Sequence, residues 1–214
     1  MLSLEHTLLL LPGILVGFTV HEFAHAWVAL RLGDDTAQRM GRFSLNPMRH
    51  IDLIGFILLL TAGFGWAKPV MIDHSKLRRP RRDDVLIAVA GPFSNLALSI
   101  VGTALLAVLI AVLPYRGNQI LTWGLQALNA GIFVNLGLFV FNLIPIPPLD
   151  GSHVALQALN IRNPVNVRAF YKYGTILLLG IIVAERALNV DILPIGPAIR
   201  FLGNGLLGLF GLGG

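Results

Sequence analysis

The residues best suited to chemistry in this chain are His21, Glu22 and His25, which stand in the order His-Glu-x-x-His. On a helix, side chains four positions apart lie on the same face, so both imidazoles could reach one metal ion. Glu22 lies beside that face, where it could take a proton from a water molecule at the metal. The chain has no cysteine, so any metal must be held by His, Asp or Glu. The spacing predicts a hydrolytic zinc site.

The setting of this motif is unusual, because residues 7–30 are otherwise almost wholly apolar. A lone histidine on a helix is usually structural, and a His-x-x-x-His pair can arise by chance. A charged residue near the middle of a bilayer, however, costs about 2.5–3.5 kcal/mol on insertion scales, so such residues usually mark function. The glutamate in the same turn as the two histidines therefore favours a metal site.

The composition indicates a membrane protein. Of the 214 residues, 55% are hydrophobic and only 13% are charged, whereas soluble domains carry about 25% charged residues. The net charge of +5 could suggest nucleic-acid binding. The Lys and Arg residues lie in loops beside apolar runs, however, so we interpret them as topology signals and expect no nucleic-acid partner.

The apolar runs predict an all-α polytopic membrane protein with about four to six membrane segments. We expect a single integral-membrane domain over residues 1–214, with a core at 7–155 and C-terminal membrane segments within 173–214. The expected spanning helices of the core are residues 7–30, a helix within 84–113, and residues 123–143.

The stretch between the first two spanning helices has a different pattern. Residues 53–62 are apolar but too few to span comfortably, and basic clusters flank them on both sides, which favours a re-entrant or interfacial segment. Residues 39–45 and 67–72 could form short strands around it. We therefore expect a small re-entrant β-hairpin, with 67–72 at its edge because Pro69 has no N–H to donate.

A catalytic zinc usually has three protein ligands, so a third ligand must reach the depth of His21 and His25. The positive-inside rule places the N-terminus outside and the Arg31 end of the first helix in the cytosol. At 1.5 Å per residue, the two histidines lie roughly 9–15 Å from that end. Asp150 follows another inward-running helix in a Pro-rich segment, so it can reach the same cytosolic half of the bilayer.

Structural roles are favoured for the other polar residues. The stripe of Gly91, Asn95, Ser99 and Thr103, four residues apart, favours a helix-packing face, with Asn95 the member best placed to do more. A surface or capping role is favoured for His153, which lies near a turn, although it is close enough to Asp150 to be a secondary candidate for a role around the ligands. Surface or capping roles are favoured for the remaining acids and histidines outside the apolar runs, namely Asp52, Asp73, Asp83, Asp84, His50 and His74.

Two motifs together resemble the site-2 proteases, a family of intramembrane zinc metalloproteases. They are His-Glu-x-x-His at 21–25 and Asn-x-x-Pro-x-x-x-x-Asp-Gly at 142–151, and residues 90–95 are similar to the family's intervening Gly-Pro-x-x-Asn segment. The chain looks like the minimal subgroup without PDZ or CBS domains. The resemblance, over residues 10–155, implies one Zn²⁺ per chain. It implies zinc ligation by His21, His25 and Asp150, a general base in Glu22, and supporting roles for Asn142 and Asn95.

The resemblance implies a zinc metalloendopeptidase that hydrolyses peptide bonds within or near transmembrane segments, as in regulated intramembrane proteolysis. Its partners would be a transmembrane protein or peptide substrate and the lipid bilayer, with the site in the cytosolic half of the cytoplasmic membrane. The oligomeric state is left open. The alternative is a non-proteolytic zinc-binding carrier or scaffold, because an intramembrane His-Asp cluster can mark an ion pathway. Glu22 argues against it, since a carrier needs no general base.

Overall fold

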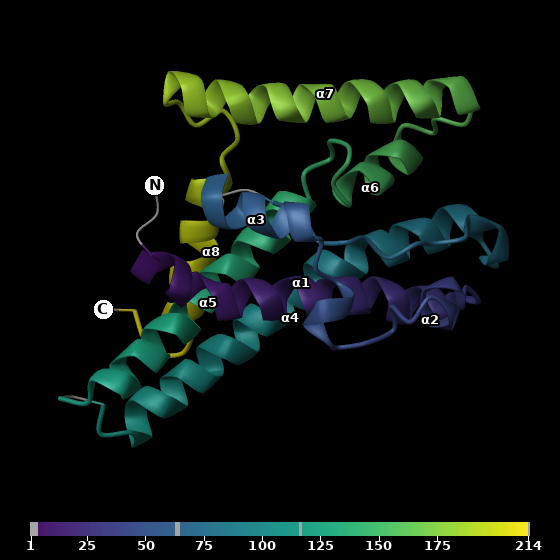
Figure 1. Cartoon of the computed structure of the whole chain (residues 1–214). Helices are drawn as coiled ribbons and strands as arrows, with labels where there is room; N and C mark the ends of the chain where they lie inside the picture. The colour runs from purple at the N-terminus through teal and green to yellow at the C-terminus, as the bar shows by residue number, and fades with distance from the viewer. Residues whose placement is uncertain (1–3, 63–64, 116, 214) are drawn as a thin grey trace.

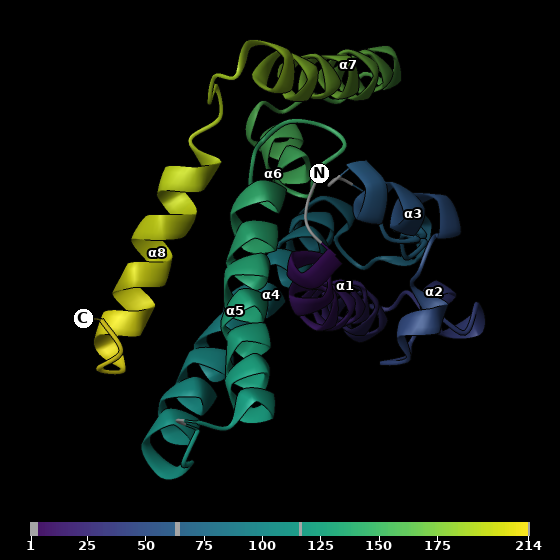
Figure 2. The same cartoon turned by 60° about the vertical axis from the view of Figure 1, so that its left-hand side comes forward.

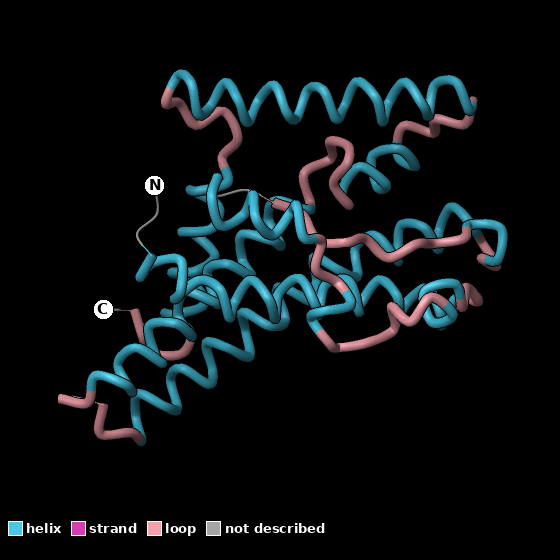
Figure 3. Tube along the Cα trace, in the orientation of Figure 1, coloured by secondary structure: helices cyan, strands magenta, loops and turns pink. Residues whose placement is uncertain are grey.

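The computed structural model describes residues 4–62, 65–115 and 117–213, which form helices and no strand (Figures 1 and 3). The long helices are α1 (Leu4–Leu32), α4 (Pro80–Val112), α5 (Gln119–Asn142) and α7 (Pro164–Leu188). The shorter elements are α2 (Thr36–Arg39), η1 (Pro47–Arg49), α3 (Leu53–Ala62), η2 (His74–Lys76), α6 (Gly151–Ala158) and α8 (Ile195–Leu209).

Within the described residues, four helices are long and apolar enough to cross a membrane, by length and composition, at Thr7–Leu32, Pro80–Val112, Gln119–Asn142 and Pro164–Leu188. The all-α polytopic prediction is therefore confirmed, at the lower end of the expected number of segments. The ten residues of α3 and the fifteen of α8 are shorter than the ~20 that a helical span needs.

The core is built from α1, α4 and α5, which pack against one another, while α8 packs along α5 (Figure 2). Small residues allow the close approach of α1 to α5, because a Cβ atom on Gly13 would overlap the backbone of Gly131. Between α4 and α5 lies a cluster of the buried side chains Leu106, Ile132 and Leu136. These contacts hold α1 and α4 in the fixed relation on which the site depends.

The predicted β-hairpin at residues 39–72 is wrong. Among the described residues of this stretch, pairing is limited to one isolated antiparallel bridge between Ile51 and Ala67, and the rest forms α2, η1, α3 and irregular segments. The reason is that backbone N–H groups near α1 are bound by side chains. The N–H of Val70 donates to Glu22 Oε2 at 2.9 Å, and that of Asp73 donates to the buried Asp34 Oδ2 at 2.7 Å.

Helix α7 begins at Pro164 rather than near Tyr173, where the apolar run begins. Proline at the first helical position and the Asn163 side chain, which accepts a hydrogen bond from Val165 N, account for the earlier start. The helix lies apart from the three-helix core, across the end that carries α6 (Figures 1 and 2). Many of its apolar side chains are exposed, as a bilayer-facing helix requires, among them Ile176, Leu177, Leu179 and Val183.

Candidate metal centre

The three side chains proposed as ligands converge in the structure. His21 and His25 point from one face of α1, and Asp150 stands immediately before α6, after the Pro-rich turn that follows α5. Asp150 Oδ2 lies 3.1 Å from His21 Nε2 and 3.5 Å from His25 Nε2. One donor atom from each residue lies within 4.8 Å of the other two. The residues predicted from the helical spacing and from the expected membrane depth of Asp150 therefore lie close together in the structure.

The hydrogen bond on the far side of His25 fixes its tautomer. His25 Nδ1 lies 2.7 Å from the carbonyl oxygen of Ile87 on α4. A carbonyl oxygen can only accept, so Nδ1 carries the proton and donates. In the neutral imidazole, Nε2 then presents a lone pair toward Asp150, which is the arrangement that metal-binding histidines adopt.

The same logic applies to His21 through a chain of two amides. Asn95 Nδ2 donates to the Gly17 carbonyl oxygen at 3.1 Å and to Asn135 Oδ1 at 2.9 Å, so the Asn95 amide oxygen is turned toward His21. His21 Nδ1 lies 2.7 Å from that oxygen and must donate to it. In the neutral ring, His21 Nε2 therefore also presents a lone pair, and Asn95, which is fully buried, orients the ring.

The site fits a cation. With neutral rings, two imidazole lone pairs and a carboxylate oxygen face one another, and Asp150 Oδ2, which has no other polar partner, lies 3.1 and 3.5 Å from the two Nε2 atoms. Such a group of acceptors is unfavourable unless a positive charge lies between them. Gly91 on α4 leaves the room, because a Cβ atom there would lie 2.6 Å from both His21 Nε2 and His25 Cε1. Two His nitrogens and one carboxylate oxygen match the ligand set of hydrolytic zinc sites.

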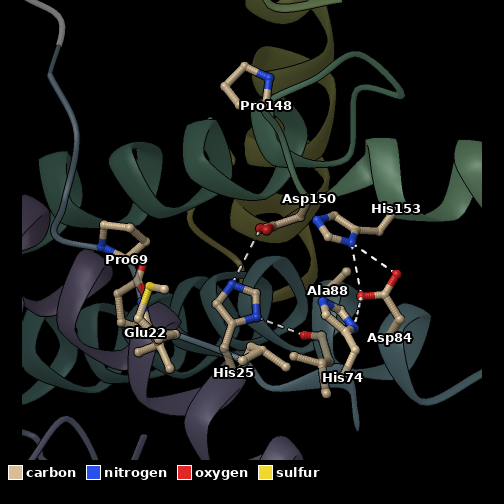
Figure 4. Close-up of a pocket in the computed structure, with 13 residues that line it drawn as sticks. Glu22, His25, Pro69, His74, Asp84, Ala88, Pro148, Asp150 and His153 are labelled. Atoms are coloured by element: carbon tan, nitrogen blue, oxygen red, sulfur yellow. Dashed lines mark hydrogen bonds and ion pairs between the residues drawn. The ribbon is translucent and has the colours of Figure 1, made fainter. Parts of the chain in front are cut away.

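Glu22 lies beside the ligands and is buried. It lines a cavity of about 300 Å³ together with His25, Asp150 and the segment Pro69–Ile72, shown in Figure 4. Its Oε2 accepts the hydrogen bond from Val70 N, which fixes the carboxylate. The other carboxylate oxygen is then the one available to take a proton in the cavity.

The two predicted supporting asparagines differ. Asn95 contacts a ligand directly, whereas Asn142 Nδ2 donates to the Leu138 carbonyl oxygen of its own helix, at 3.0 Å. Asn142 is thus not brought to the ligands, and its role stays a prediction. Asn135, seven positions before Asn142 on α5, completes the amide chain behind His21.

The surface position expected for Asp83 and Asp84 is wrong. They belong to the first turns of α4, with 3% and 7% of their surface exposed, whereas the capping role holds for Asp83, whose Oδ2 accepts from Arg79 N at the start of the helix. Pro80, at the first helical position, was the sequence signal that could have shown this. Asp84 Oδ1 and Oδ2 each lie 3.0 Å from His153 Nδ1. His50, expected at the surface, is also buried, with Nε2 2.7 Å from the Ser44 carbonyl oxygen.

Comparison with protein families decides the class. The model described as Peptidase family M50 matches residues 9–122 and 108–182. The chain belongs to peptidase family M50. The membership confirms the resemblance to the site-2 proteases and the prediction of a membrane zinc metalloprotease. With its four apolar helices, this M50 chain is an integral membrane protein.

Similar proteins occur in Bacillus, Mycobacterium and Methanocaldococcus. YwhC of Bacillus subtilis (strain 168) is 43% identical over 178 residues, which cover 79% of this chain and 78% of YwhC. Rip2 of Mycobacterium tuberculosis (strain H37Rv) is 32% identical over 154 residues, covering 70% and 56%. MJ0611 of Methanocaldococcus jannaschii is 33% identical over 141 residues, covering 64% of each. Each carries the name "Putative zinc metalloprotease". No solved structure matches significantly.

Proposed function

We propose that this M50 protein hydrolyses peptide bonds within or near transmembrane segments of membrane proteins, with one zinc ion held by His21, His25 and Asp150. The observation that carries the ligand assignment is the convergence of Asp150 Oδ2 with His21 Nε2 and His25 Nε2, at 3.1 and 3.5 Å, on rings that donate from Nδ1. Zinc bound there would act as a Lewis acid on the scissile carbonyl and lower the pKa of the attacking water toward 7.

Glu22 is the general base. It takes a proton from the attacking water and then delivers this proton to the leaving amine. The Val70 N–H holds one carboxylate oxygen, so the other faces the reaction without the carboxylate having to reorient. Burial of the site excludes bulk water, which strengthens every electrostatic contact with the reacting groups.

We place the site in the cytosolic half of the cytoplasmic membrane, with the N-terminus outside. The C-terminal end of α1 and the N-terminal end of α4 lie at the same end of the molecule (Figure 1), joined by the buried cluster Ala29, Leu77 and Ile87. Arg31 and the basic residues 78–82 lie at that end, which the positive-inside rule assigns to the cytosol.

The cavity supports an unwound substrate. At about 300 Å³ it is at the small end of ligand pockets, whereas a helix with its side chains is about 10–12 Å across. A transmembrane segment must therefore extend locally before its peptide bond reaches Glu22. The protease domain is the single unit 1–214, and its core, residues 7–155, contains every residue given a chemical role.

The experiment that tests this function places the purified wild-type protein in liposomes with a model transmembrane peptide. We expect cleavage of the peptide and no zinc flux across the membrane, and Asp150→Ala should lose its zinc on dialysis and its activity with it. Zinc flux without cleavage by the zinc-loaded wild type would instead support the carrier and contradict the protease.

A further inference from the structure

A second polar cluster adjoins the metal-site cavity, and the proposed function gives it no role. Asp84 on α4 is its centre, with the imidazole of His153 from α6 against both carboxylate oxygens (Figure 4). His74 Nδ1 lies 3.5 Å from Asp84 Oδ1, and Tyr171 of α7 places its hydroxyl 3.3 Å from His153 Nε2. Among the described residues, the metal-binding geometry is met by His21, His25 and Asp150 and not by this cluster.

His153 is rigidly connected to Asp150. Helix α6 begins at Gly151, directly after Asp150, and the His153 N–H donates to the Asp150 carbonyl oxygen at 3.0 Å. The start of α6 is pressed onto the end of α5, because a Cβ atom on Gly151 would lie 2.6 Å from the Ile144 carbonyl oxygen. A shift of the start of α6 relative to α4 therefore moves Asp150 as well, and the His153 side chain is the contact that anchors this part of α6 to Asp84 on α4.

Helix α4 supports the other two ligands. The Ile87 carbonyl oxygen accepts a hydrogen bond from His25 Nδ1, and Asn95 Oδ1 accepts one from His21 Nδ1. Asp84 lies three positions before Ile87, on the neighbouring part of the same helix face. Helix α4 thus orients His21 and His25 directly. Through the contact of Asp84 with His153 it also reaches the segment that carries Asp150.

We propose that the Asp84–His153 hydrogen bond is the positioning contact for Asp150, holding its carboxylate at the distance from His21 and His25 that zinc requires. The proposal rests on the proposed zinc ligation. Both residues act through Asp150 and not on substrate. Groups that hold metal ligands in place typically change metal affinity by 10–100-fold when removed, and we expect the Asp84–His153 contact to fall in that range.

The test measures zinc affinity of the purified full chain by competition with a chelator, and the visible absorption of the Co²⁺-substituted protein, which reports ligand geometry. Asp84→Ala should weaken zinc by about 10–100-fold and alter the Co²⁺ spectrum. Asp84→Asn keeps an oxygen that can accept from His153 and should restore most of the affinity. Asp83→Ala is the matched control, since this neighbouring buried carboxylate accepts from Arg79 N and, among the described residues, forms no hydrogen bond or ion pair with α6.

Wild-type zinc affinity and an unchanged Co²⁺ spectrum in Asp84→Ala would overturn the proposal, as would equal weakening by Asp83→Ala. If Asp84→Ala fails to fold, His153→Ala removes the same contact from a side chain that is 29% exposed, with the same expectation and the same contradictory outcome. Asp150→Ala separates the two proposals. If it leaves zinc affinity unchanged, the ligand assignment itself fails; if it alone weakens zinc, only the positioning contact fails.

Discussion

Gly91→Ala is the smallest change that should disable the metal centre. The added methyl group would lie 2.6 Å from His21 Nε2 and from His25 Cε1, and nearer still to His25 Nε2. Ordinary contacts between such atoms are about 3.5–4.0 Å, and a zinc ion bonds an imidazole nitrogen at about 2.0–2.1 Å. The methyl group thus takes the place that the ion needs.

The expected magnitude follows from how little the ligands can move. Each ring is held at Nδ1 by a 2.7 Å hydrogen bond, so retreat of about 1 Å means breaking one of these bonds or bending α1 from α4. Overpacking of this kind costs about 1–3 kcal/mol. At 1.4 kcal/mol per tenfold, zinc affinity should fall by at least about 5–150-fold if the site relaxes, and further if the methyl blocks it.

The assay is chelator competition on the purified protein, with thermal unfolding measured on the same sample. Alanine is a better helix former than glycine by about 0.8–1.0 kcal/mol, so poor helix propensity cannot explain a loss of zinc. Gly124→Ala on α5 is the matched control, because no heavy atom lies within 4 Å of a Cβ atom there. Its zinc affinity should equal that of the wild type.

The reasoning would be refuted by a Gly91→Ala protein that binds zinc and cleaves peptide as the wild type does. Equal losses in Gly91→Ala and Gly124→Ala would also contradict it, because only the first places an atom between the ligands.

Three further results are expected. Val70→Pro removes the N–H that binds Glu22, and a hydrogen bond to a charged group is worth about 1.5–3 kcal/mol, so kcat should fall about 10–100-fold while zinc is retained. Val70→Ala keeps this N–H, and an equal loss of kcat in that variant would disprove the role. Asn95→Ala should lower the zinc affinity by about 10–100-fold because it releases the His21 ring, as a metal titration can show. Asn142→Ala should leave the zinc affinity unchanged and raise KM for the peptide, as a peptide titration can show. Chelation should abolish cleavage and lower the unfolding temperature, since ligand at 100 times its Kd stabilises by about 2.7 kcal/mol; a chelated protein that still cleaves peptide would contradict zinc catalysis.

The convergence of His21, His25 and Asp150 could be predicted because it follows from positions along the sequence alone. The helix period puts His21 and His25 on one face, and the distribution of basic residues sets the depth at which Asp150 must lie. Both rules hold whatever the details of packing. The family motifs then selected the same residues independently.

The hairpin prediction failed because it used local signals for a segment governed by distant partners. Extended residues with a proline at the edge are typical of a strand, but Val70 and Asp73 give their N–H groups to Glu22 and Asp34, 48 and 39 positions away. The side chains of Glu22 on α1 and of Asp34 just after it thereby replace the pairing strand.

The supports of the site were hidden for a similar reason. Asp84 follows a basic run that looked solvated, and its partner His153 lies 69 positions away. Gly91 could be assigned to a small-residue stripe, but its value as empty space between two imidazoles depends on where α1 crosses α4. The sequence shows that Gly91 is small, but only the packing of α1 against α4 shows that its lack of a side chain leaves space for a metal ion.

The central claim is tested most directly by Glu22→Gln, measured for zinc content and for cleavage of a transmembrane peptide in the same liposome preparation. Glutamine keeps the shape of the side chain and an oxygen that can accept from Val70 N but cannot serve as the base. We predict one zinc ion per chain and no cleavage. Cleavage at the wild-type rate by this variant would contradict the assignment of Glu22 as the general base.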